Sequence, residues 1–189
     1  NKVFYITSDN LLSIQRKIIS LLEQYQKDYP LRVAMPREEV RNHVGWGQLE
    51  FSALINTLSP IVEPHNTGLK NKHWEPQLNE KNKKEIDLLR EQFEINGFHL
   101  IKININDELL RYLSATGEVV NCGNGLILSA SQFSEAINTI TTYCKVNLSI
   151  TLAEARDRLG TNRRIAQSVL EELDKRQITK RNGDVRTLQ

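Results

Sequence analysis

The segment 129–188 has a strict order of helix and turn signals, which limits the fold more than any other feature of the chain. Apolar residues from Phe133 to Cys144 follow one another at helical spacing. Ser129 lies just before them, with a glutamine three residues later, which is the spacing of a capping box. A second capping box starts at Thr151 and predicts a short helix.

The end of this segment predicts a longer helix and a hairpin. Thr161 is expected to cap the helix, whose buried side carries Ile165 and Leu173. Two short strands then follow, and we expect them to be joined at Asn182–Gly183, the commonest dipeptide of two-residue turns. The order helix, short helix, longer helix, hairpin is that of a winged helix.

The same order occurs earlier in the chain, once in full and once reduced. The full pass predicts helices over 11–25, 36–40 and 47–59 and a hairpin that turns at 66–68. The reduced pass predicts helices over 85–95 and 106–115, a strand over 100–105 and a hairpin that turns at 123–125.

These passes predict a mainly α fold with small β-hairpins (α+β), arranged as a tandem array of three winged-helix domains. The domains are a winged helix over 1–77, a reduced winged helix acting as a spacer over 78–129, and a third winged helix over 130–189. Linkers are expected near 77–84 and 129–131. The alternative is a single α-rich domain with incidental hairpins.

Composition excludes several classes of protein. With 189 residues, 39% hydrophobic and 25% charged, the chain has enough apolar side chains for a core. It contains neither a long apolar run nor a secretion signal, so we expect a cytoplasmic protein without membrane contact. Cys122 and Cys144 form no disulfide framework or zinc set. Because its only methionine is Met35, we expect a piece of a longer protein.

Charge is concentrated at the end of the chain. The net charge is only +2, but residues 139–189 carry ten basic and six acidic side chains, whereas residues 77–138 carry six and nine. This asymmetry predicts a polyanionic partner for the last domain alone.

Two arginines strengthen this prediction. Arg163 and Arg164 lie in the first turn of the predicted longer helix, where the helix dipole makes cations unfavourable by up to about 1 kcal/mol. A helix start with added arginines is typical of phosphate binding. The alternative is that both side chains turn to solvent or pair with Glu154, Asp157 or Glu171.

The predicted wing is also basic. Its cations face only Asp174 and Asp184, and on a two-stranded ribbon such charges also prevent edge-to-edge pairing. The basic residues are Lys175, Arg176, Lys180, Arg181 and Arg186.

No other site is predicted. The four histidines have no metal-ligand spacing, no nucleotide-binding glycine motif occurs, and no nucleophile, base and orienting group stand together. We therefore expect neither catalytic residues nor a metal nor a cofactor in this chain. Trp46 is expected to pack between helices, although base stacking is an alternative.

Residues 150–188 resemble the last winged helix of bacterial selenocysteine-specific elongation factors (SelB). The matching positions of the first half are Thr151, Arg156, Asp157, Leu159, Thr161, Arg163 and Arg164. Those of the second half are Leu173, Asp174, Thr179, Arg181, Gly183, Asp184 and Arg186. Residues 10–140 are similar, more loosely, to the preceding winged helices of that family.

The resemblance implies a function. Such a region binds an mRNA hairpin (SECIS) and so directs selenocysteinyl-tRNA to an in-frame UGA codon on the ribosome. The parent protein would be a GTPase, with GTP and Mg in a part outside this chain, and we expect a monomer. The RNA-binding residues carried over by position are Thr161, Asn162, Arg163, Arg164, Arg181, Gly183, Asp184 and Arg186. Arg156 is either a further contact or an internal partner of Asp157.

Two other classes compete with this interpretation. A DNA-binding winged-helix transcription regulator would prefer a duplex, and a protein-interaction scaffold would bind no nucleic acid.

Overall fold

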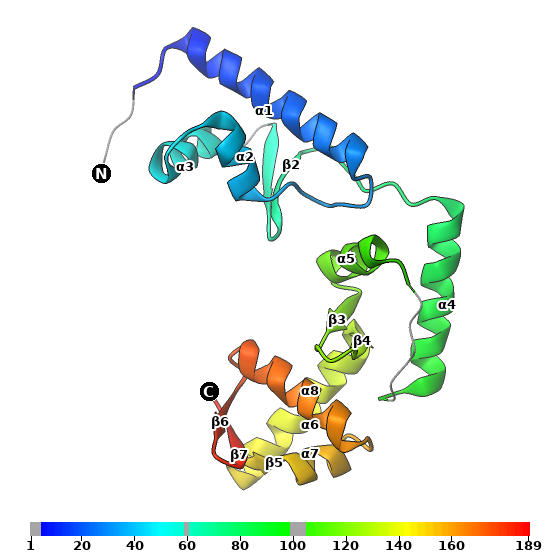
Figure 1. Ribbon diagram of the computed structural model, residues 1–189. Helices are drawn as coiled ribbons and strands as arrows, with labels where there is room; N and C mark the ends of the chain where they lie inside the picture. The colour runs from blue at the N-terminus through cyan, green and yellow to red at the C-terminus, as the bar shows by residue number, and fades with distance from the viewer. Residues whose placement is uncertain (1–4, 59–60, 99–104) are drawn as a thin grey trace. The chain divides into compact units, whose positions relative to one another are not determined.

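The computed structural model describes residues 5–58, 61–98 and 105–189, which fall into two compact units (Figure 1). Unit 1 consists of Asn1–Glu80 and Asp107–Ala115, and unit 2 consists of Lys81–Asn106 and Thr116–Gln189. The predicted mixture of helices and small antiparallel sheets is confirmed. The tandem of three domains is not confirmed, because the segment 78–129 is shared between the two units.

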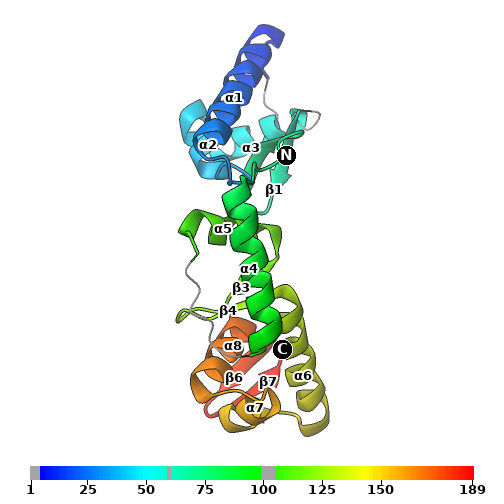
Figure 2. The ribbon, with the colours of Figure 1, turned by 90° about the vertical axis from the view of Figure 1, so that its right-hand side faces the viewer.

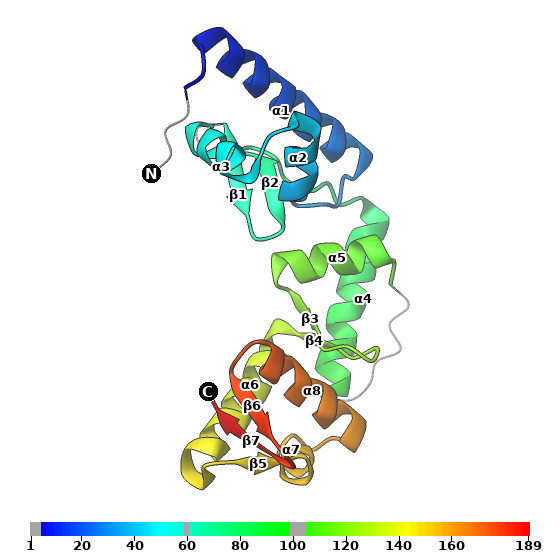
Figure 3. The same ribbon diagram turned by 60° about the vertical axis from the view of Figure 1, so that its left-hand side comes forward.

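Unit 1 contains the predicted order of three helices and a hairpin. Its strands pair antiparallel from Val62↔Asn71 to His65↔Gly68, and a single bridge joins Met35 to Leu69. Helix α1 packs against α2 and the second strand (Figure 3). The elements are α1 (Ser8–Asp28), α2 (Arg37–Val44), α3 (Gln48–Thr57), β1 (Val62–His65), β2 (Gly68–Asn71) and most of α5 (Asp107–Thr116).

Unit 2 contains a three-helix winged helix with a hairpin and a long helix before it. The wing has three strands in the order β5-β7-β6, and it lies between α6 and α8 in Figure 2. The elements are α4 (Glu80–Asn96, of which Glu80 belongs to unit 1), β3 (Val119–Asn121), β4 (Ile127–Ser129), α6 (Ala130–Asn147), β5 (Ile150–Thr151), α7 (Leu152–Arg158), α8 (Arg163–Lys175), β6 (Thr179–Asn182) and β7 (Val185–Leu188).

Both predicted capping boxes are confirmed. The Ser129 hydroxyl accepts from the backbone N–H of Gln132, and the Thr151 hydroxyl accepts from that of Glu154. In each box the third residue's side chain accepts from the cap backbone N–H in return. Because Ser129 also ends β4, the predicted linker at 129–131 is wrong: the hairpin continues directly into α6.

Three further predictions concern the start of α8, the segment 77–84 and the segment 100–105. Thr161 does not cap α8; the cap is Asn162, whose Oδ1 accepts from the backbone N–H of Ile165 at 3.0 Å. The predicted linker at 77–84 is helical from Glu80 onward, because α4 begins there. The strand expected over 100–105 lies almost wholly at 99–104, outside the described residues.

One apolar core joins the β3–β4 hairpin to the winged helix of unit 2. Val120, Cys122, Leu126 and Leu128 of the β3–β4 hairpin belong to the same buried cluster as side chains of α6, α7 and α8. Burial raises the pKa of the Cys122 thiol to about 12, so it is an inert core residue. The hairpin is therefore part of the domain that carries the basic surface.

Two findings concern the described residues only. None of their helices is both long and apolar enough to cross a membrane. They also contain no group of three or more His, Cys, Asp or Glu side chains that could hold a metal ion.

Candidate nucleic-acid interface

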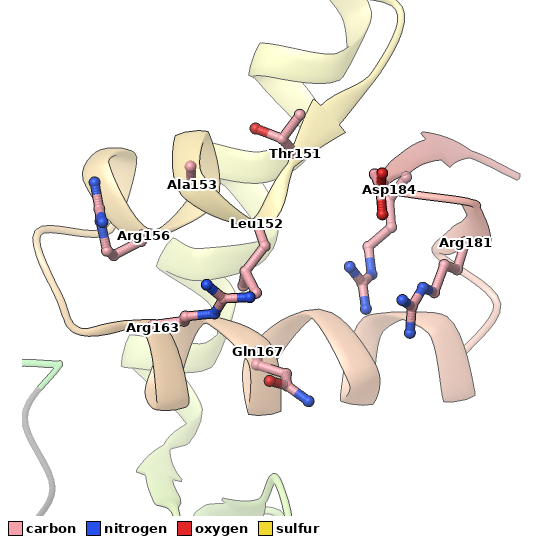
Figure 4. Close-up of a pocket in the computed structure, with 9 residues that line it drawn as sticks. Thr151, Leu152, Ala153, Arg156, Arg163, Gln167, Arg181 and Asp184 are labelled. Atoms are coloured by element: carbon pink, nitrogen blue, oxygen red, sulfur yellow. The ribbon is translucent and has the colours of Figure 1, made fainter.

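A basic hollow lies between α7, α8 and the wing of unit 2, with a volume of about 360 Å³. Figure 4 shows Arg156, Arg163 and Arg181 around it, each from a different element. Its lining residues are Thr151, Leu152, Ala153, Arg156, Arg163, Gln167, Arg181, Asp184 and Arg186. Four of these nine side chains are arginines, so the hollow is suited to an anion.

Arg163 is the first residue of α8, directly after the cap Asn162. Its side chain is exposed and has no hydrogen-bond or ion-pair partner among the described residues. The dipole of α8 adds positive potential at this end of the helix. A phosphate here would meet a free guanidinium and a helix N-terminus together.

The wing hairpin contributes Arg181 and Asp184. Because Asn182 pairs with Val185, the two turn residues are Gly183 and Asp184, one position later than predicted. Gly183 has φ +61°, and glycine is the usual residue at the first central position of type II′ turns. Its carbonyl oxygen accepts a 3.1 Å hydrogen bond from Arg181 Nε, which leaves the two Nη groups of Arg181 facing solvent.

Arg186 lies on the inner wall of the hollow. It was predicted as an RNA contact, but its side chain is buried. Its Nε donates to Asp174 Oδ2 at 2.9 Å, and only 5% of its side chain is exposed. Lys175 and Arg176 also have a partner, because Glu172 lies 3.7 Å and 2.8 Å from them. The freely exposed basic surface of the wing is thus smaller than the sequence suggested.

Arg164 points away from the hollow. Its Nη2 donates a 2.7 Å hydrogen bond to the carbonyl oxygen of Asn124, in the β3–β4 turn. Neither Arg163 nor Arg164 pairs with any of the three carboxylates that the sequence offered as alternative partners. Glu154 accepts from Tyr143, Glu171 accepts from Gln167, and Asp157 accepts from Arg156.

The structure therefore divides the predicted site residues. Four of them line the hollow, namely Arg163, Arg181, Asp184 and Arg186. The others have structural contacts: Thr161 donates to the carbonyl oxygen of Phe98 at 2.6 Å, Asn162 caps α8, and Gly183 forms the turn. Arg156 both pairs with Asp157 and lines the hollow.

Sequence reasoning missed four lining residues, which are Thr151, Leu152, Ala153 and Gln167. The first three reach the hollow because β5 pairs with β7, and a strand of two residues leaves no readable pattern. Gln167 was recoverable, since it lies one helical turn after Arg163 on the same side of α8.

Asp184 is the only carboxylate among the lining residues. A carboxylate repels phosphate and accepts hydrogen bonds from base N–H groups or a ribose 2′-hydroxyl. The hollow therefore combines donors for a nucleic-acid backbone with a carboxylate acceptor for a base or sugar.

Residues 142–188, which contain the whole hollow, match the profile of the family described as "Elongation factor SelB, winged helix". This segment is similar to the winged helix of SelB elongation factors. The matched segment extends from within α6 to the end of β7. No curated protein matches the chain.

Two solved structures are similar to larger parts of the chain. A bacterial selenocysteine-specific elongation factor, EF-Sec, is 17% identical over 99% of this chain and 31% of that one, with a TM-score of 0.49. The mRNA-binding domain of SelB from E. coli, in complex with SECIS RNA, is 23% identical over 59% of this chain and 99% of that one, with a TM-score of 0.48. The chain thus spans about a third of the elongation factor, and the match to the family profile covers residues 142–188.

Proposed function

We propose that this chain is the mRNA-binding part of a selenocysteine-specific elongation factor and that its SelB winged helix binds an RNA hairpin in the basic hollow. The observation that carries the proposal is the unpartnered guanidinium of Arg163, placed at the start of α8 on the wall of a hollow that Arg181 also lines. Two exposed arginines at a helix N-terminus and a wing form a phosphate-binding arrangement.

The size and composition of the hollow favour a hairpin loop over a duplex. A hairpin tip offers splayed phosphates and unstacked bases to a small surface, whereas a duplex groove needs a long recognition face. The surface available to a ligand consists of Arg163 and Gln167, from the first two turns of α8, and of the wing turn. Asp184 gives this surface one acceptor with which to select a base or a ribose.

The wider role follows from the family. In it the hairpin would be a SECIS element, and binding would direct selenocysteinyl-tRNA to an in-frame UGA codon on the ribosome. GTP hydrolysis, Mg binding and tRNA binding would then belong to the parent protein rather than to this chain. The acidic segment 77–138 is proposed to act outside the RNA contact, since it carries an excess of carboxylates.

Fluorescence anisotropy tests the proposal with three labelled probes. They are a pool of RNA stem-loops with one fixed stem and a randomised loop, a DNA duplex with the stem sequence, and a linear RNA of the same composition. We expect the stem-loop pool to bind most tightly at every salt concentration. Preference for the duplex would favour a DNA-binding regulator, and binding to none of the three would favour a protein scaffold.

A further inference from the structure

Helix α8 has two sides with different neighbours. Arg163 and Gln167, one turn apart, line the hollow. Arg164 and Ser168, also one turn apart, both form a hydrogen bond with Asn124 in the β3–β4 turn instead. Successive helical residues point about 100° apart, so these two arginines cannot share one phosphate site while α8 keeps this orientation.

Among the described residues, the hydrogen bonds from the β3–β4 turn to α8 both involve Asn124. Its carbonyl oxygen accepts from Arg164 at 2.7 Å, and its side-chain Nδ2 donates to the hydroxyl of Ser168 at 3.2 Å. Ser168 is buried, so this second contact lies against the core of unit 2. Arg164 is held by a backbone atom that substitution at position 124 does not remove.

The shape of the turn is set by its sequence. Gly123, Asn124 and Gly125 all have positive φ angles, between +52° and +78°, which glycine and asparagine tolerate best. The backbone N–H of Gly123 donates to Asn121 Oδ1 at 2.9 Å, and that of Cys122 donates to the Leu126 carbonyl oxygen at 2.9 Å. The turn is therefore a rigid support for α8.

A second contact holds the start of α8 from the side of α4. Thr161 Oγ1 donates to the Phe98 carbonyl oxygen at 2.6 Å. The carbonyl oxygens of Phe93 and Gly97 accept from Gln132 Nε2 at 3.0 Å and 2.7 Å. The end of α4 is thus fixed to α6 through Gln132. The residue Phe98, which follows α4, is fixed to Thr161, two residues before α8 begins.

We infer that Arg164, held by the turn at 123–125, is a positioning residue: it orients α8 so that Arg163 faces the hollow, and it does not itself contact RNA. This inference rests on the proposed function. Its basis is the guanidinium of Arg164, which is bonded to the Asn124 carbonyl on the side of α8 away from the hollow. A fixed helix start reduces the ordering cost of binding, which is how a residue outside the contact contributes to affinity.

The test measures stem-loop affinity and its salt dependence with the whole chain and the stem-loop pool. Arg164→Ala is expected to weaken binding about threefold to tenfold, the effect of losing one ordered contact group. The slope of log K against log salt is expected to stay at the wild-type value, because no phosphate contact is lost. Arg164→Lys is expected to restore most of the affinity, since an ammonium group also donates to the Asn124 carbonyl.

Two uncharged variants and one control accompany Arg164→Ala. Asn124→Gly keeps the positive φ and the carbonyl oxygen but loses the contact to Ser168, and Ser168→Ala loses the same contact from the other side. Both are expected to weaken binding about twofold to fivefold without changing the salt slope. Lys145→Ala removes one exposed charge from the last turn of α6 and is expected to have wild-type affinity.

The opposing outcomes are distinct. A slope of log K against log salt that is less negative by about 0.7–0.9 in Arg164→Ala would show that Arg164 contacts a phosphate, and it would overturn the inference. Wild-type affinity in both Arg164→Ala and Asn124→Gly would also overturn the inference. If their melting temperatures were lowered, the contacts between the β3–β4 turn and α8 would then contribute to stability but not to RNA binding. If Arg164→Ala does not fold, Arg164→Gln decides the question by its salt slope, because the glutamine amide can still donate to the Asn124 carbonyl oxygen but carries no charge for a phosphate. A wild-type chain that binds no stem-loop would overturn the proposed function together with this inference.

Discussion

Arg186 Nε donates a 2.9 Å hydrogen bond to Asp174 Oδ2, which joins the second wing strand, β7, to the last turn of α8. The other carboxylate oxygen of Asp174 accepts from the hydroxyl of Thr179 in β6, at 2.6 Å. One carboxylate therefore holds the wing strands β6 and β7 against α8. This contact fixes the position of the turn that carries Asp184 at the edge of the hollow.

Asp174→Ala is expected to lower the free energy of unfolding of unit 2 by about 2–4 kcal/mol, because it leaves the buried Arg186 without a counter-charge. Urea unfolding followed by circular dichroism measures this loss. The matched control is Asp157→Ala, which removes an exposed carboxylate paired with Arg156 and is expected to cost less than about 1 kcal/mol. Equal losses in the two variants would contradict the structural role of Asp174.

The second prediction concerns the pH dependence of unit 1. The hydrogen bond from Arg32 holds the pKa of Glu108 below its usual value of 4.5. Because the folded pKa lies below the unfolded one, this ion pair contributes fully above about pH 4.5, and its contribution is lost as the pH falls through the folded pKa. Glu108→Gln is therefore expected to be less stable than the wild type near neutral pH and equally stable in acid.

Tryptophan fluorescence measures this difference, since Trp46 and Trp74 both belong to unit 1. Trp74 is a direct reporter because its Nε1 donates to the carbonyl oxygen of Arg32 at 3.1 Å. A stability difference between wild type and Glu108→Gln that does not decrease as the pH is lowered through the acid range, until Glu108 is protonated, would show that this ion pair is not its cause.

The third prediction concerns the end of α6. Leu148 follows this helix in the left-handed conformation, with φ +67°, which is strained for a leucine. Because Leu148 is 80% exposed, little apolar burial offsets this strain. Leu148→Gly is expected to raise the free energy of unfolding by about 0.5–1 kcal/mol, as glycine adopts this conformation freely. The control Val146→Gly lies in the last turn of the same helix and is expected to lower it by about 0.5 kcal/mol. The same sign in both variants would contradict this assignment of strain.

Local signals carried most of what the sequence could predict. The two capping boxes and the order of helices and hairpins depend on neighbouring residues, and the structure confirms them. The charged start of α8 was also visible, because Arg163 and Arg164 follow each other in a strongly amphipathic helix. Adjacent residues in a helix point to different sides. The sequence does not show which elements lie on each side, so it did not separate the role of Arg163 from that of Arg164.

Long-range contacts account for the rest. Arg164 meets Asn124, 40 residues earlier, and Thr161 meets Phe98, 63 residues earlier. The pairing of Ile150 with Arg186 brings the start of α7 to the wing, although the strand β5 has only two residues. The burial of Arg186 depends on Asp174 and on the register of the wing, in which the turn lies one residue later than the sequence suggested.

The most direct test of the central claim is the salt dependence of stem-loop binding by the double variant Arg163→Ala/Arg181→Ala, with Lys145→Ala as the charge control. If the hollow binds the hairpin backbone, the slope of log K against log salt becomes less negative by about 0.7–0.9 for each arginine removed, and the affinity falls. If the double variant keeps the slope and affinity of Lys145→Ala, the hollow is not the RNA-binding site.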